Sequence, residues 1–260
     1  MSALDDVFTR CRAEGRAALV AYLPAGYPDL KTSVAAVRAV AAAGADVVEV
    51  GVPYTDPLMD GPVIEQAASQ ALAGGFRLSH VFDVVRAVRD AGAVPVVMSY
   101  GNPVLRHGPD RFAAELAAAG GAGMITPDLI PDEAGVWRAA ADEHGLDPIF
   151  LVAPSSTDER LRMTAEACRG FVYVASTMGV TGARTSVGGS AAALVERTRA
   201  VTDLPLCVGL GVSTGDQAAQ VAEFADGVIV GSALVRTVGQ DPTLGALGEL
   251  TQELARGVRR

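Results

Sequence analysis

The sequence predicts an α/β protein: a single (β/α)8 (TIM) barrel domain over residues 1–260, with an extra N-terminal helix and an extended loop plus short helix after strand two. Two observations predict it. Short runs rich in Val, Ile and Leu do not alternate with polar residues, as in parallel strands buried on both faces, and they alternate with stretches of helical spacing. Eight such units over about 250 residues are typical of a barrel. The runs are Ala18–Leu23, Val47–Val50, Ala93–Met98, Gly123–Thr126, Ile149–Ala153, Phe171–Ala175, Leu204–Val208 and Gly227–Val230. A doubly wound sheet is the alternative, but no GxGxxG motif opens its first helix.

The segments between the runs complete the barrel. Residues 4–13 predict a helix before the first strand, able to cap the bottom of the barrel, and residues 242–256 predict the eighth helix. The longest interval lies between the second and third runs. It holds the loop Gly51–Pro62, followed by a short helical piece over residues 63–72. Long loops after barrel strands lie at the carboxyl end, where barrel active sites are built.

Composition excludes several classes of function. Acidic residues outnumber basic ones by 30 to 21, giving a net charge of -9, which argues against nucleic acid as a partner. The three histidines show no metal-ligand spacing, so no metal is expected. Three scattered cysteines indicate a reducing compartment, and the acidic start lacks a signal core. No run reaches the ~20 apolar residues of a membrane span. We expect a cytoplasmic protein that does not bind a membrane.

Two carboxylates are the main catalytic candidates. Glu49 lies inside the apolar run 47–50, where an ionised carboxylate is costly unless it is paired or faces a polar cavity. A structural ion pair is the alternative to a catalytic acid or base. Asp60 follows in the long loop together with Asp56. Asp60-Gly61 is also a common turn pair, but two carboxylates in different environments can divide acid and base roles.

Glycine-rich turns follow the last three predicted strands. They comprise residues 179–182, Gly209 with Gly211, and Gly231 with Ser232. Glycine lets backbone amides approach an anion, and barrel phosphate sites commonly use the last loops. The alternative is that these are only tight turns between a strand and a helix.

Three tyrosines lie in or at the end of predicted strands: Tyr22, Tyr100 and Tyr173. Strand alternation favours Tyr173 facing opposite to its neighbours, into the barrel. Three aromatic rings at one end of the barrel could bind a flat apolar ligand, although they are equally compatible with an ordinary hydrophobic core. Together with the carboxylates and turns, they indicate an enzyme acting on a phosphorylated substrate without a bound cofactor.

Seven specific motifs run along the chain in order, at residues 22–26, 48–62, 99–103, 127–129, 179–182, 208–212 and 230–233. Through these motifs the chain resembles the tryptophan synthase alpha chain family over essentially its whole length. The resemblance implies a barrel that cleaves indole-3-glycerol phosphate to indole and glyceraldehyde 3-phosphate in tryptophan biosynthesis. It also implies a partner beta chain in an alpha2beta2 assembly; the beta chain, and not this chain, would carry pyridoxal phosphate.

The resemblance also implies which residues form the site, because they occupy positions that match the functional residues of the family. Glu49, Asp60 and Tyr173 match the catalytic residues of the family. The positions that match substrate-binding residues are Tyr22, Tyr100, Thr181, Gly182, Gly209, Gly211, Gly231 and Ser232. The loop that carries Asp60 also predicts a docking surface for the beta chain, with Pro53, Asp56 and Pro57 exposed at the barrel mouth.

Three departures from the family pattern stand out: Tyr27, Met59 and Met178. None removes a catalytic group. Three other functions stay open at this point: another phosphate-sugar barrel enzyme, a stand-alone indole-glycerol-phosphate lyase, and a mainly regulatory subunit that activates a beta chain. Retention of both carboxylates argues against a purely regulatory role.

Overall fold

The computed structural model describes residues 2–175, 189–209 and 211–260. Within these residues, nine strands form one parallel sheet in the order β5-β4-β3-β2-β1-β9-β8-β7-β6. The strands are β1 (Ala18–Pro24), β2 (Val47–Gly51), β3 (Val94–Met98), β4 (Gly123–Ile125), β5 (Asp147–Ile149), β6 (Leu151–Val152), β7 (Val172–Ala175), β8 (Leu206–Gly209) and β9 (Gly227–Val230). The first and last strands of this order are separated in the chain only by Phe150. The sheet therefore curls round into a barrel, and the predicted fold class is confirmed.

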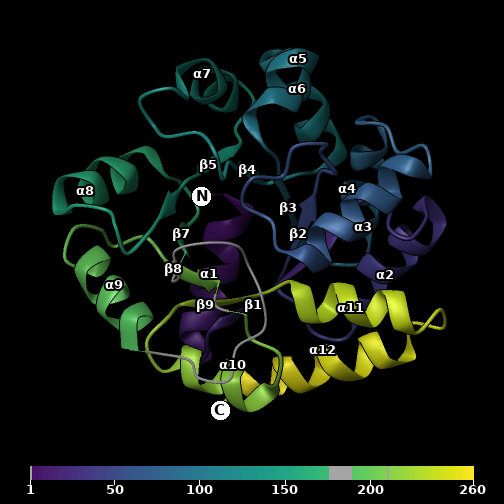
Figure 1. Ribbon diagram of the computed structural model, residues 1–260. Helices are drawn as coiled ribbons and strands as arrows, with labels where there is room; N and C mark the ends of the chain where they lie inside the picture. The colour runs from purple at the N-terminus through teal and green to yellow at the C-terminus, as the bar shows by residue number, and fades with distance from the viewer. Residues whose placement is uncertain (1, 176–188, 210) are drawn as a thin grey trace.

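Helices surround the barrel (Figure 1). They are α1 (Ala3–Ala13), α2 (Leu30–Ala42), α3 (Pro62–Ala73), α4 (His80–Asp90), α5 (Gly101–His107), α6 (Pro109–Ala119), α7 (Gly135–Glu143), α8 (Asp158–Ala167), α9 (Gly189–Arg199), α10 (Gly215–Ala222), α11 (Ser232–Gln240) and α12 (Gly245–Gly257). The extra piece after the second strand is α3, as predicted. None of the helices among the described residues is long and apolar enough to span a membrane.

Three differences from the sequence prediction go beyond a shift of one residue at the end of an element. The predicted fifth strand is interrupted at Phe150, so that its two halves pair with opposite neighbours. The strand predicted from Leu204 begins at Leu206 because Pro205 has no amide hydrogen to donate to the sheet. The predicted eighth helix begins at Gly245, and a further helix, α11, directly follows the last strand.

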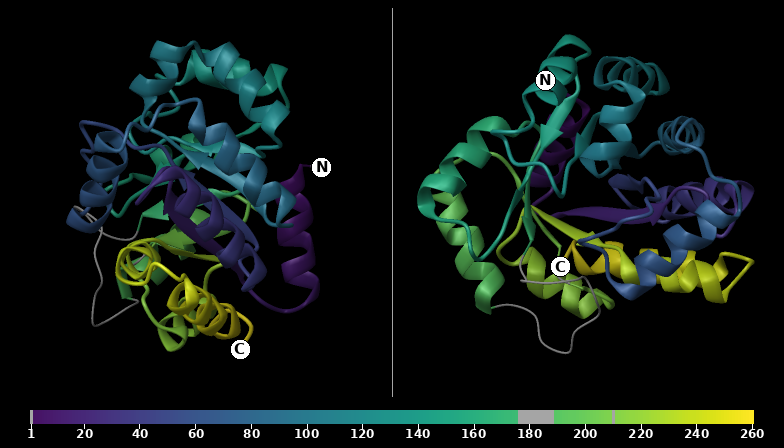
Figure 2. Two further views of the ribbon diagram at one scale, coloured as in Figure 1. Left: turned by 90° about the vertical axis from the view of Figure 1, so that its right-hand side faces the viewer. Right: turned by 45° about the horizontal axis from the view of Figure 1, so that its top comes forward.

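Helix α1 closes the amino-terminal end of the barrel, as the sequence suggested. A capping box starts it: Ser2 accepts from the Asp5 amide, and the Asp5 side chain accepts from the Ser2 amide. Apolar residues recur along α1 at helical spacing and form one face, which comprises Leu4, Val7, Phe8 and Cys11. This face packs with the inward side chains of the strands, and Phe8 meets Phe171 edge to face at 5.8 Å. Figure 2 shows α1, in dark purple, across one end of the barrel. The opposite, carboxyl end stays available for a site.

Candidate active site

Strand alternation directs Glu49 into the barrel. On β2, Val48 and Val50 pack in the outer cluster between the sheet and the helices, whereas Val47 packs in the inner cluster. Glu49 shares the inward parity of Val47. In the register of the sheet it lies beside Tyr22 of β1. The candidate acid is thus at the carboxyl end of the barrel interior.

Glu49 is a buried carboxyl group without a hydrogen-bond partner. Only 1% of the residue is exposed, and neither carboxylate oxygen has a partner among the described residues. Burial, together with the nearby charge of Asp60, raises the pKa of Glu49 to about 8. Among the described residues, Glu49 therefore forms no structural ion pair, which was the alternative to a catalytic role. At pH 7 this carboxyl is mostly protonated.

Asp60 differs from Glu49 because it has a defined donor. The Tyr100 hydroxyl accepts a hydrogen bond from the Met59 amide at 2.9 Å and donates one to the Asp60 carboxylate. Burial raises the pKa of Asp60 to about 6, while the bond from Tyr100 acts in the opposite direction. Asp60 is thus mostly ionised at pH 7, so the two carboxyls are held in different protonation states.

Two tyrosines fill the mouth of the barrel against glycines. A methyl group on Gly51 would fall 2.3 Å from the Tyr22 hydroxyl, and one on Gly209 would fall 2.6 Å from the Tyr173 hydroxyl. Glycine at both positions leaves room for these rings. Burial raises the pKa of both tyrosines well above its ordinary value, and the charges of Glu49 and Asp60 raise it further. The two rings therefore lie within electrostatic reach of both carboxylates.

The last two strands end in turns of the predicted kind. Gly211 has a φ of 68°, a left-handed conformation that favours glycine. Gly231 is the N-cap residue of α11 and provides no side-chain cap. The amides of the first turn of α11, beginning with Ser232, are thus not capped by Gly231 and remain available to an anion. Thr181 and Gly182 lie outside the described residues.

The loop that carries Asp60 is only partly exposed. Asp56 is exposed and Pro57 half-buried, but Pro53 is buried, so its predicted exposure is wrong. Pro53 follows the end of β2 by only two residues, so it stays packed at the carboxyl end of the barrel. Sequence reasoning also missed Asn102, whose side-chain amide donates to the Tyr54 hydroxyl at 2.7 Å. Only the position of Asn102 just beyond a strand end could have indicated this contact.

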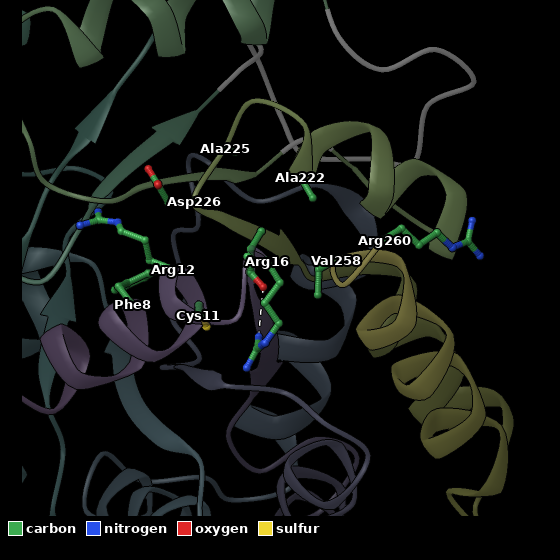
Figure 3. A pocket seen from close by; sticks show the side chains of 11 residues that line it. Phe8, Cys11, Arg12, Arg16, Ala222, Ala225, Asp226, Val258 and Arg260 are labelled. Carbon is green, nitrogen blue, oxygen red and sulfur yellow. Dashed lines mark hydrogen bonds between the residues drawn. The ribbon is translucent and has the colours of Figure 1, made fainter.

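The opposite end of the barrel has a cavity of about 240 Å³, lined by α1, the segment after it, the residues before β9 and the C-terminus. Three arginines line it, but Figure 3 shows that they diverge. Arg16 binds Asp46, and Arg260 binds Asp216. This arrangement offers no convergent set of donors for a ligand, so the cavity is not the candidate active site.

One group among the described residues has potential metal-ligand spacing. Asp110, Glu143 and His144 bring their ligand atoms within 4.8 Å of one another. Both carboxylates are exposed, and His144 already pairs with Asp110 at 2.9 Å. The group lies on α6 and at the end of α7, apart from Glu49 and Asp60.

Comparison with known proteins agrees with the geometry. The family model described as "Tryptophan synthase alpha chain" matches residues 8–256. The alpha chain of Mycobacteroides abscessus is 62% identical over 257 residues, covering 99% of this chain and 97% of that protein. That of Nocardia farcinica is 61% identical over 258 residues, covering 99% and 96%.

Solved structures give the same result. A Mycobacterium tuberculosis tryptophan synthase chain superposes with a TM-score of 0.95 at 59% identity, covering 100% of this chain and 99% of that one. The alpha subunit of Legionella pneumophila str. Paris has a TM-score of 0.88 at 33% identity, covering 99% and 98%. The chain therefore belongs to the tryptophan synthase alpha chain family.

Proposed function

We propose that the mouth of the barrel cleaves indole-3-glycerol phosphate to indole and glyceraldehyde 3-phosphate, with Glu49 as the general acid and base. Family membership makes the chain a carbon–carbon lyase of tryptophan biosynthesis. The observation that carries the assignment of roles is the protonated carboxyl of Glu49, which has no hydrogen-bond partner in the described part of the chain, close to an ionised Asp60. We also propose that residues 1–260 act as one domain.

The reaction adds one proton to the substrate and removes another from it. Cleavage requires protonation of the indole C3 atom and loss of the proton from the hydroxyl on the adjacent side-chain carbon. A protonated Glu49 gives its proton to C3, and the carboxylate so formed takes the hydroxyl proton as the carbon–carbon bond breaks. The hydroxyl carbon becomes the aldehyde of glyceraldehyde 3-phosphate, and Glu49 ends the cycle protonated. A pKa of about 8 suits a group that must both give and take a proton near neutral pH.

Asp60 stabilises the charge that this step creates. Protonation at C3 leaves positive charge on the indole nitrogen, and an ionised carboxylate near its N–H forms a charge-assisted hydrogen bond. The bond from Tyr100 favours the ionised form of Asp60. The rings of Tyr22, Tyr100 and Tyr173 provide flat apolar walls for the indole.

The phosphate binds at the glycine turns. The uncapped first turn of α11, with Gly231 and Ser232, provides amide donors and the positive end of a helix dipole. Gly209 and Gly211 bring the neighbouring turn close. The resemblance to the family adds Thr181 and Gly182, which lie outside the described residues, as further substrate-binding positions. Binding energy from the phosphate positions the substrate rather than acting on the bond that breaks.

An alpha chain implies a beta chain partner. Three neighbouring segments support a docking surface: the loop 53–60, helix α5 and the segment 128–136 are joined by hydrogen bonds from Asn102 to Tyr54 and from the Gly101 amide to Asp128. Each carries exposed apolar side chains: Leu58 and Met59 on the first, Leu105 on the second, Ile130 and Val136 on the third. Leu58 is 81% exposed, which an isolated enzyme has little reason to keep.

Asp56 and Pro57 form the edge of this surface, and Pro53 is buried at the start of the loop. The assembly is alpha2beta2, with pyridoxal phosphate in the beta chain and no cofactor in this chain. Partner binding closes the loop and moves Asp60 toward the indole nitrogen, so we expect it to raise turnover.

The test is the release of indole from indole-3-glycerol phosphate, measured with and without a beta chain. The chain alone is expected to release indole slowly, and the beta chain to raise the rate. No indole under either condition would contradict the proposed reaction. A rate that the beta chain does not change would instead identify a stand-alone lyase.

A further inference from the structure

We infer that Asp128 is a positioning residue for the cleavage reaction, acting on Asp60 through the first turn of α5 and Tyr100. The inference rests on the proposed function, because it assigns Asp128 to the same site. Asp128 itself lies one loop away, after β4, and no step of the proposed chemistry uses it. What connects it to the site is a continuous chain of hydrogen bonds and packing contacts.

The first link fixes the start of α5. The Gly101 amide donates to both carboxylate oxygens of Asp128, at 2.9 and 3.1 Å. Gly101 is the first residue of α5, and Tyr100, in the N-cap position, supplies no side-chain cap. The carboxylate of Asp128 therefore takes the place of a capping side chain from another loop. Leu129 packs against Gly101 so closely that a methyl group there would lie 2.9 Å from it.

The second link joins α5 to the catalytic loop. Tyr100 directly precedes the capped residue, and its hydroxyl holds both the Met59 amide and the Asp60 carboxylate. Asn102, the next residue after Gly101, donates to the Tyr54 hydroxyl at 2.7 Å. The Tyr54 and Tyr100 rings lie 5.4 Å apart. Residues on both sides of the Gly101 amide therefore hold the loop at its two ends.

Removal of the Asp128 carboxylate leaves the Gly101 amide without its cap, so the first turn of α5 is free to shift. Tyr100 would then lose its alignment with Asp60. A misplacement of about 1 Å can reduce a rate by about 100-fold even when the chemistry is untouched. A merely structural cap would instead lower the stability of α5 without changing the protonation of Asp60.

The experiment is a double-mutant cycle of Asp128→Ala and Tyr100→Phe, read as kcat and KM for indole release. We expect Asp128→Ala to lower kcat by about 10-fold with little change in KM, and Asp128→Asn, whose amide oxygen still accepts from Gly101, to restore most of it. In the Tyr100→Phe background, Asp128→Ala should lower kcat by less than about twofold. Equal losses in both backgrounds would overturn the inference.

Asp158→Ala is the matched control. Asp158 is an exposed aspartate at the start of α8, and its carboxylate is paired with Arg197 at 2.7 Å. Its loss should leave kcat unchanged, because Asp158 lies outside the loop 53–60, α5 and the segment 128–136. If Asp128→Ala does not fold, Asp128→Glu provides the same test, since it keeps the charge but moves the acceptor by one methylene group.

A second measurement does not depend on activity. The carboxyl carbon of Asp60 is titrated by NMR without substrate in the wild type, Asp128→Ala and Tyr100→Phe. Both variants should raise the pKa of Asp60, since both remove the donation from Tyr100. An unchanged pKa in Asp128→Ala, with a raised one in Tyr100→Phe, would overturn the inference even if the chain proved to have another substrate. An absence of indole release in the wild type would count against the proposed function alone.

Discussion

Two buried carboxyl groups three positions apart, Asp46 and Glu49, have opposite environments. Asp46, just before β2, is 7% exposed and receives two hydrogen bonds from Arg16 at 2.8 and 2.9 Å and one from the Leu19 amide at 3.0 Å. Burial alone would raise the pKa of Asp46, but the Arg16 and Leu19 bonds outweigh it and hold that pKa below its usual value. Glu49, within β2, has no partner among the described residues, and its pKa is raised to about 8.

Pairing, and not burial alone, distinguishes these two carboxyl groups. A buried carboxylate that is fully paired contributes to the fold at the amino end of the barrel, where α1 and β1 meet β2. A buried carboxyl without a partner destabilises the fold, so its presence at the carboxyl end requires another reason. The proposed proton transfer would supply such a reason, since only a carboxyl group with a raised pKa holds its proton at neutral pH.

The largest expected effect is the loss of activity in Glu49→Gln. Glutamine keeps the shape of the side chain but can neither give nor take the proton, so kcat for indole release should fall by about 10²–10⁴-fold. Circular dichroism should show an unchanged fold. Retention of more than about a tenth of the wild-type rate is incompatible with an acid/base role of this strength.

Asp46→Ala should affect the fold instead of the chemistry. It leaves Arg16 buried, with Glu14 as its remaining carboxylate partner, so unfolding should become easier by about 3 kcal/mol, the lower end of the range for a broken buried pair. Urea unfolding measures this free energy. The kcat of the folded protein should change less than twofold. A loss of stability below about 1 kcal/mol would mean that burial and pairing of Asp46 do not matter in this way.

The pH dependence of stability should separate the two groups. Above the ordinary pKa of Glu near 4.5, the unfolded chain has released the proton that folded Glu49 keeps until about pH 8. Glu49 therefore lowers stability as pH rises through this window, by at most about 1.4 kcal/mol per pH unit.

Glu49→Gln removes this dependence, so its stability relative to the wild type should increase from pH 5 to pH 8 in urea unfolding. Asp46 has the opposite sign: its lowered pKa adds stability above the ordinary Asp value, and this stability is lost as pH falls through the lowered pKa. A constant difference between wild type and Glu49→Gln would contradict the raised pKa of Glu49.

The apolar runs were sufficient to predict the fold, and Glu49 was conspicuous because a charged residue interrupts one of them. Local pattern could not predict the break at Phe150, since it depends on which neighbour each half of the strand pairs with. The burial of Pro53 and the bonds of Tyr100 to residues 59 and 60 also depend on contacts between distant segments. Asp128 belongs to a motif of the family resemblance, but its contact with the Gly101 amide arises only when β3 and β4 lie side by side.

A smaller effect is expected from Tyr100→Phe. Phenylalanine keeps the ring but removes the donor to Asp60, so the pKa of Asp60 should rise above about 6. The acidic limb of the kcat/KM profile should therefore move to higher pH by less than about one unit, while the alkaline limb near pH 8 stays in place. If both limbs move together, the two pKa values belong to a coupled pair and not to separate groups.

The most direct test is an NMR titration of the side-chain carboxyl carbons of Glu49 and Asp46 in the same sample of wild-type protein. Glu49 should titrate with a midpoint of about 8, while Asp46 should stay ionised below the ordinary pKa of an aspartate. This result would show that the carboxyl just before β2 and the carboxyl within β2 have separate roles. A midpoint for Glu49 near its ordinary value of 4.5 would contradict the assignment of Glu49 as the proton donor.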